Sequence, residues 1–152
     1  MTTDFMARVG GLTCALLDVV LGRRPPQLQV AALCLRGKPA RREVLLVSSL
    51  GSGRWIIPKG WPMRGRTLAE AALREAWEEA GVEGEVGAQA FGTFSYLKHR
   101  HGLPRRCTVQ VFVVRVSGLV DDYPEAGRRA RRWMRPLDAA GMVEEAELKA
   151  LL

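Results

Sequence analysis

Three glutamates stand close together in the segment Trp55 to Val82, at positions 75, 78 and 79. Residues three and four positions apart lie on one side of an α-helix, so this spacing predicts that Glu75, Glu78 and Glu79 share a face. Carboxylates held together repel one another unless positive charge is placed among them. Magnesium and manganese ions prefer oxygen ligands and are often held by a few carboxylates together with substrate phosphates. The spacing therefore indicates a divalent-cation site.

A strand, a loop and a helix are expected to position these glutamates. The apolar run Trp55 to Ile57 predicts a short buried strand that the following proline ends. A loop containing Gly60 comes next, and Gly81 is expected to end the helix as a C-cap glycine. Glu70 and Glu83 are expected on a solvated surface.

The rest of the chain predicts a single α/β domain over residues 25–152, because 152 residues offer one sizeable core and little length for a second. Alternating and β-branched runs predict further strands, and helical spacing predicts a closing helix over residues 143–152, with Ala140 and Gly141 breaking the chain before it. The first two predicted strands, residues 27–36 and 43–49, are expected to pair antiparallel. Residues 86–96 and 108–117 are predicted to form a second strand pair.

Residues 1–24 are predicted to be an N-terminal extension that contains a peripheral helix. Its apolar segment, Val9 to Gly22, is interrupted by Asp18 and is shorter than a membrane span. It lacks the basic start and the small cleavage-site residues of a signal peptide. We therefore expect neither a membrane partner nor secretion.

The net charge indicates what kind of molecule the protein binds, and the cysteine content indicates the cellular compartment. The net charge of +7 favours an anionic partner, which nucleic acid, a membrane surface or a phosphate-rich small molecule would all provide. The three cysteines, Cys14, Cys34 and Cys107, are few and widely separated. This pattern argues against a disulfide framework or a zinc site, and it predicts buried thiols in a reducing, cytoplasmic compartment.

Two basic segments offer candidate phosphate contacts. The connection from Lys98 to Arg106 holds four Lys or Arg residues and both histidines of the chain. It is either a solvated hairpin loop or a phosphate clamp, and neither histidine is assigned to a metal because further ligands are lacking. The run from Arg128 to Arg135 is either a charged edge strand or a second phosphate contact.

Residues 60–82 resemble the Nudix box of the Nudix hydrolases, whose pattern is G-x5-E-x7-R-E-U-x-E-E-x-G-U with U apolar. Gly60 matches the first position, and Arg74-Glu75-Ala76-Trp77-Glu78-Glu79-Ala80-Gly81-Val82 matches the last nine. One position departs, because Arg66 stands where the family has its first glutamate, a residue that supports the box arginine. The resemblance implies an α/β/α sandwich with a mixed β-sheet over most of residues 27–152.

The resemblance also implies the chemistry, which is hydrolysis of a diphosphate linked to another group. It implies that Mg²⁺ or Mn²⁺ is held by Glu75, Glu78, Glu79 and the Gly60 carbonyl. It implies that Arg74 orients these carboxylates and that Glu79 also activates the attacking water. Glu125 is a further candidate for a metal or base contact.

The basic segments are similar to those of the branch that cleaves diphosphoinositol polyphosphates and diadenosine polyphosphates. A polyphosphorylated small molecule is therefore the expected substrate. The candidate phosphate contacts are Lys59, Arg64, Arg66, Lys98, Arg100, Arg105, Arg131 and Arg132. Two alternatives stay open. One is an RNA 5′-pyrophosphohydrolase. The other is a non-catalytic Nudix-like binding module, and the loss of the glutamate at position 66 favours this second alternative. A nucleic-acid partner is less favoured because the arginine run lacks interleaved aromatic residues.

Overall fold

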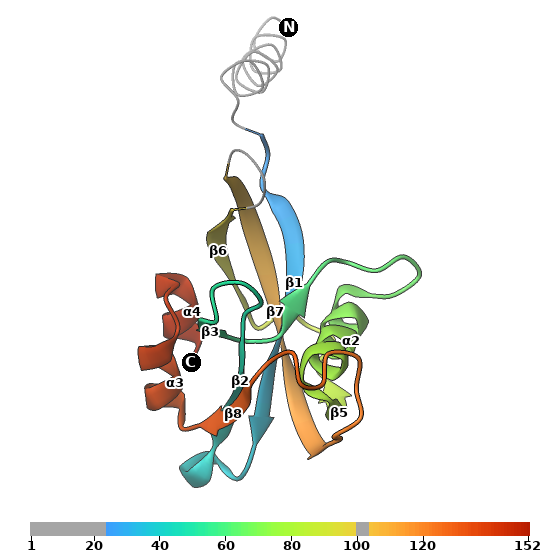
Figure 1. The fold of residues 1–152 in the computed structure, drawn as a ribbon, viewed down its shortest axis with the longest axis vertical. Helices are drawn as coiled ribbons and strands as arrows, with labels where there is room; N and C mark the ends of the chain where they lie inside the picture. The colour runs from blue at the N-terminus through green and yellow to red at the C-terminus, as the bar shows by residue number, and fades with distance from the viewer. Residues whose placement is uncertain (1–23, 100–103) are drawn as a thin grey trace, which may run out of the picture.

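The computed structural model describes residues 24–99 and 104–152 (Figure 1). A mixed β-sheet lies between helix α2 (Leu68–Ala80) on one side and helices α3 (Pro136–Met142) and α4 (Ala146–Leu151) on the other (Figure 1). The predicted α/β/α sandwich is therefore confirmed. The helix predicted within residues 1–24 lies outside the described residues. No helix of the described part of the chain is long and apolar enough to cross a membrane.

Strand β1 forms the centre of the sheet. It runs parallel to β7, from Gln27 opposite Cys107 to Leu35 opposite Arg115, and the other strand pairs are antiparallel. The order is β3-β2-β1-β7-β5, while β4 pairs with β1, β6 with β7 and β8 with β2. The strands are β1 (Gln27–Arg36), β2 (Glu43–Ser48), β3 (Trp55–Ile56), β4 (Lys59–Gly60), β5 (Val82–Val86), β6 (Gly92–Lys98), β7 (Arg105–Leu119) and β8 (Arg131–Met134), with a 3₁₀ turn, η1 (Pro39–Arg41), between β1 and β2.

The single strand predicted over residues 86–96 is wrong. The structure has two strands there, β5 and β6, which lie against different parts of the long strand β7. Glycine and glutamate have low strand propensity, so the sequence VEGEV of β5 gives a weak local signal, and its pairing with β7 makes it a strand. The β-branched run predicted as 108–117 extends to residues 105–119 because it pairs on both edges.

The break predicted at Ala140 and Gly141 is also wrong, because both residues lie inside α3. Pro136 occupies the first turn of α3, where its fixed φ angle and missing N–H suit a helix start. The closing helix begins at Ala146, three residues later than predicted, since Glu145 is its N-cap.

The core explains why β1 reads as an uninterrupted apolar run. Residues 29–34 are all buried because helices cover both faces of the sheet at its centre. Alanines at positions 69, 72, 76 and 80 line the buried face of α2, and their small side chains let the helix approach the sheet. Cys34 and Cys107 are buried free thiols, as predicted, while Cys14 lies outside the described residues. Burial raises the pKa of Cys34 far above its usual value, so this thiol stays protonated.

Candidate active site

Helix α2 carries the glutamates and is fixed at both ends. At its start, the Glu70 N–H donates to Thr67 Oγ1 over 3.1 Å, and the Thr67 N–H donates to Glu70 Oε2 over 2.7 Å. This capping box satisfies two N–H groups that a helix start leaves unpaired, so Glu70 has a structural role beyond the solvated one predicted. At its end, Gly81 takes the left-handed conformation with φ 66°, as expected of a C-cap glycine.

Gly60 lies against the carboxylate of Glu75. A Cβ atom added at position 60 would lie 2.1 Å from Glu75 Oε1, far inside van der Waals contact. Only glycine therefore lets the β4 backbone approach this carboxylate so closely. The structure thus brings together two of the residues predicted to hold a metal ion.

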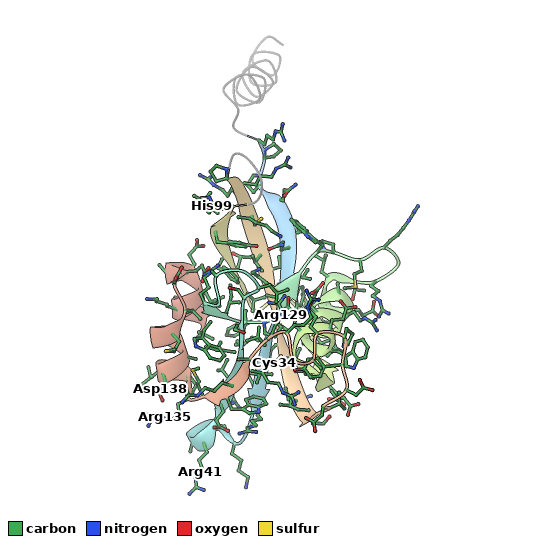
Figure 2. All side chains as sticks on the ribbon, in the orientation of Figure 1. Cys34, Arg41, His99, Arg129, Arg135 and Asp138 are labelled. Atoms are coloured by element: carbon green, nitrogen blue, oxygen red, sulfur yellow. The ribbon has the colours of Figure 1, made fainter. Side chains whose placement is uncertain are left out.

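Glu79 points from α2 toward the sheet and is 6% exposed. Its Oε2 atom accepts a hydrogen bond of 3.3 Å from the Lys59 N–H. Its Oε1 atom lies 3.1 Å from Nη2 of Arg129. Figure 2 shows Arg129 beside α2, reaching it from the segment that precedes β8. Backbone and arginine contacts therefore fix both oxygens of the candidate general base.

Arg129 also draws a fourth carboxylate to the helix. Its Nε atom donates to Glu125, and its Nη1 atom donates to the Ser48 carbonyl over 3.1 Å. The Glu125 N–H donates to the Glu78 carbonyl over 3.0 Å, which ties residue 125 to the helix backbone. Glu125 therefore lies beside the box glutamates, although it is far from them in sequence.

Arg74 pairs with Glu78 at a partly exposed position on the helix. Its Nε atom donates to Glu78 Oε1 over 2.7 Å, which is a favourable pairing four residues apart. Its guanidinium carbon lies 4.3 Å from the ring centroid of Trp77. Arg74 thus orients one of the three carboxylates predicted for it.

Two carboxylates of the cluster bind protons more tightly than an exposed glutamate does. Burial, followed by repulsion from Glu78 and Glu125, raises the pKa of Glu75 to about 7. Burial also raises the pKa of Glu79, although Arg129 and Lys59 oppose the rise. Within residues 24–99 and 104–152, no three acidic, histidine or cysteine side chains already converge as a metal site. Three of the carboxylates form ion pairs with arginines: Glu78 pairs with Arg74, and both Glu79 and Glu125 pair with Arg129.

The donor set nevertheless fits a hard divalent cation. The four carboxylates and the Gly60 backbone offer oxygen donors, the type that Mg²⁺ and Mn²⁺ prefer. Ionising Glu75 and Glu79 together is unfavourable as the site stands, and a bound cation would remove this cost. The residues present therefore suit the predicted metal.

Lysine 59 supplies a buried cation next to these carboxylates. Its Nζ atom lies 4.9 Å from the centroid of the Tyr96 ring, and the Tyr96 hydroxyl donates to Oε1 of the buried Gln29 over 2.5 Å. Burial lowers the pKa of Lys59, and attraction to Glu79 opposes this change. The positive charges of Lys98, Arg54 and Arg129 lower it further. Four cations thus face one region, which suits a substrate with several phosphates.

Lys98 ends strand β6 and belongs to the same basic region. Its Nζ atom lies 4.7 Å from the ring centroid of Trp61, the residue that follows Gly60. Arg105 is the partner of Lys98 across the β6–β7 pair. Arg100 lies outside the described residues. His99 is exposed at the end of β6, well away from Arg129 (Figure 2).

Arg64 and Arg66 are exposed in the segment between β4 and α2. Arg66 lines a hollow of about 450 Å³ together with Arg74 and Trp77. A second hollow of about 540 Å³ continues along β5, and neither Glu75 nor Glu79 lines either hollow. Arg66 thus lies near Arg74, the arginine of the box. We therefore place the candidate site at the cluster of carboxylates and not at either of these hollows.

The guanidinium of Arg131 is bound by groups of the protein itself. Its Nη1 atom donates to the carbonyls of Ala80 and Val120 over 2.7 Å each, and its Nη2 atom donates to Asp121 over 2.7 Å. These bonds satisfy carbonyls at the end of α2 and after β7. Arg132, the next residue, is exposed. The guanidinium that reaches the carboxylates from this run is that of Arg129.

Sequence reasoning missed Arg129, Arg54, Trp61 and Tyr96. The arginine run was a signal for Arg129, but the sequence does not show which of several arginines turns inward. Arg54 is held by Glu145 of the α4 N-cap, a contact between residues 91 positions apart. Tyr96 lies on a strand whose neighbours are fixed only by sheet pairing.

Comparison with known proteins gives a consistent result. A family model described as the NUDIX domain matches residues 25–151. The mouse diphosphoinositol polyphosphate phosphohydrolase 3-alpha is 32% identical over 119 residues, which is 76% of this chain and 68% of that protein. Nudix hydrolase 4 of Arabidopsis thaliana is 38% identical over 92 residues, 60% of this chain but only 43% of that protein.

Solved structures show the same fold. A C. elegans Ap4A hydrolase binary complex aligns with a TM-score of 0.60 and 21% identity, covering 82% of this chain and 91% of that one. The E. coli dihydroneopterin triphosphate pyrophosphohydrolase aligns with a TM-score of 0.63 and 17% identity, covering 84% and 95% of the two chains. At these identities the likeness concerns the fold alone.

Proposed function

The chain belongs to the NUDIX domain family, and on this premise we propose that it hydrolyses diphosphate linkages in highly phosphorylated small molecules. The substrates we propose are diadenosine polyphosphates or diphosphoinositol polyphosphates, and the proposed cofactor is Mg²⁺ or Mn²⁺. The observation that carries this proposal is Glu79, buried between the Lys59 backbone and Arg129 and next to the Glu75–Gly60 contact. Free Cys34 and Cys107 support the cytoplasmic location that we also propose.

The metal would be held by Glu75, Glu78, Glu79, Glu125 and the carbonyl of Gly60. When bound, a divalent ion neutralises phosphate oxygens and lowers the pKa of a coordinated water. The remaining chemistry belongs to the chain itself. Burial raises the pKa of Glu79, and a base is most effective when its pKa lies near the working pH. Glu79 therefore takes the proton of the attacking water.

Arg129 and Lys59 position this base. The 3.1 Å contact from Arg129 and the 3.3 Å bond from the Lys59 N–H hold the Glu79 carboxylate in one orientation. Lys59 and Lys98 then bind phosphate oxygens, since charged donors at a poorly solvated site stabilise negative charge strongly.

The proposal is tested by incubating the protein and Mg²⁺ with diadenosine tetraphosphate, a diphosphoinositol polyphosphate, a nucleotide sugar and 5′-triphosphorylated RNA, and separating the hydrolysis products of each by anion-exchange chromatography. We expect turnover of one of the first two, and loss of this turnover in Glu79→Gln. Glu83→Gln is the matched control, because Glu83 is an exposed glutamate of the neighbouring strand β5. Turnover of the RNA alone would instead support an RNA 5′-pyrophosphohydrolase. Binding without turnover of any substrate would support a non-catalytic module.

A further inference from the structure

Trp61 is placed where packing does not require a tryptophan. It is 41% exposed, whereas Trp55 and Trp133 pack against the core and Trp77 lies beneath Arg74. Leaving part of a large apolar side chain exposed forgoes burial energy. The position of Trp61 is therefore unexplained by stability.

The position of Trp61 places it at the edge of the candidate active site. It directly follows Gly60, and consecutive Cα atoms are about 3.8 Å apart. The backbone of Gly60 lies against the Glu75 carboxylate, so Trp61 begins one residue away from the proposed metal ligands. The Trp61 side chain therefore starts close to where the diphosphate of a bound substrate would lie.

Lys98 fixes the ring and adds a charge. Its ammonium lies 4.7 Å from the centroid of Trp61, within the range of a cation–π interaction. A second cation–π pair lies two residues earlier on both segments. In this pair the lysine, Lys59, comes from the segment of Trp61, and the aromatic ring, Tyr96, comes from the strand of Lys98. Strands β1 and β7 lie between β4 and β6 in the sheet, so these two pairs cross the same face. A cation and an aromatic ring thus stand together at the site edge.

We propose that Trp61 and Lys98 form a nucleobase-binding subsite, so that dinucleoside polyphosphates rather than diphosphoinositols are the substrate class. This inference rests on the proposed function. The base stacks on the face of the indole ring that Lys98 does not cover, as bases stack on aromatic side chains in proteins that bind single-stranded nucleic acid. Lys98 contacts the phosphate next to the nucleoside.

The chemistry of the ring disfavours the other class. The face of an aromatic ring carries negative charge density and attracts cations, so it repels phosphate groups. A diphosphoinositol carries phosphates around a saturated ring and presents no planar surface to stack. A purine base is planar and uncharged, and it suits the indole face.

The test compares wild type, Trp61→Ala and Trp61→Phe on diadenosine tetraphosphate and on inorganic tripolyphosphate, which lacks a base. We expect Trp61→Ala to raise the KM ratio of the first substrate to the second by about tenfold, the loss of roughly 1.4 kcal/mol of stacking. Trp61→Phe should retain most of the preference. Phe91→Ala is the matched control, because Phe91 is an aromatic residue that is 55% exposed in the segment between β5 and β6. Equal KM changes for both substrates in Trp61→Ala would overturn the inference.

A binding measurement separates this inference from the proposed function. A methylene analogue of diadenosine tetraphosphate is titrated in EDTA while tryptophan fluorescence is recorded. We expect quenching in wild type that is strongly reduced in Trp61→Phe, since base stacking on position 61 is then no longer reported. Equal quenching in both proteins would contradict the subsite. Wild type that shows the quenching but hydrolyses no substrate would contradict the proposed function alone.

Discussion

Arg129 Nη2 lies 3.1 Å from Glu79 Oε1, with both side chains almost fully buried. The same guanidinium binds Glu125 and the carbonyl of Ser48. One arginine thus joins the candidate general base on α2 to a carboxylate from the β7–β8 connection. This arginine supplies positive charge to both carboxylates.

Arg129→Gln is expected to destabilise the protein. Removing one partner of a buried ion pair leaves carboxylates uncompensated, which costs about 3 kcal/mol. The loss should appear in urea unfolding with EDTA, and Mg²⁺ should restore more stability to the variant than to wild type. Arg128→Gln, at an exposed neighbouring position, is the matched control. A variant as stable as wild type in EDTA would refute this view of Arg129.

Gly60→Ala is expected to impair catalysis with little loss of fold. The new Cβ would meet the Glu75 carboxylate at 2.1 Å, so Glu75 must move. Misplacing a reacting group by about 1 Å can cost roughly 100-fold in rate. The loss is measured as kcat/KM on the substrate that wild type turns over. Gly118→Ala is the control, since a Cβ there meets no atom within 4 Å. Comparable rates for the two variants would contradict the role of Gly60.

Glu79→Gln is expected to lower kcat by about 10² to 10⁴, the usual contribution of a general base. The amide keeps the shape of the side chain but cannot take a proton. Pre-steady-state or single-turnover kinetics would show whether the chemical step is the one that slows. If kcat stayed within about threefold of wild type, another group would be the base.

The metal-free protein is expected to lose stability as pH rises. The pKa of Glu75 is about 7 in the folded protein against an ordinary value of 4.5, so the folded state binds the proton more tightly than the unfolded state. The stabilising contribution of the protonated group is complete below the unfolded pKa and is lost as pH rises toward 7. Thermal unfolding in EDTA at pH 6 and pH 8 measures this change.

Mg²⁺ should therefore raise the melting temperature more at pH 8 than at pH 6, because protons and the cation compete for the same carboxylates. Glu75→Gln should reduce the pH dependence in EDTA, since the amide does not titrate in this range. Glu83→Gln should leave it unchanged. A pH dependence that is identical in Glu75→Gln and wild type would show that another group causes it.

Arg131→Ala is expected to reduce stability rather than substrate binding. Its guanidinium satisfies the carbonyls of Ala80 and Val120 in a largely buried position, and leaving such groups unpaired costs about 1 to 3 kcal/mol. Urea unfolding should detect this loss, while Arg132→Ala, at an exposed position, should unfold like wild type. A change in KM without a change in stability would show that Arg131 binds substrate.

The sequence alone determined the helix, its capping glycine and the shared face of Glu75, Glu78 and Glu79. These features depend on contacts between residues three to five positions apart, and local spacing records such contacts directly. The central strand and the fold class were also predictable, because burial on both sides leaves a continuous apolar run such as residues 29–34.

Only the tertiary structure decided which arginine meets Glu79, that the Gly60 backbone lies against the Glu75 carboxylate, and that Trp61 lies under Lys98. Each of these relationships joins residues from different strands, helices or loops, and sheet register sets which of several similar side chains turns inward. Arg129 and Arg131 have the same side chain two positions apart, yet one reaches the carboxylates and the other the end of α2. No local pattern distinguishes them, because their difference arises from where the chain enters β8.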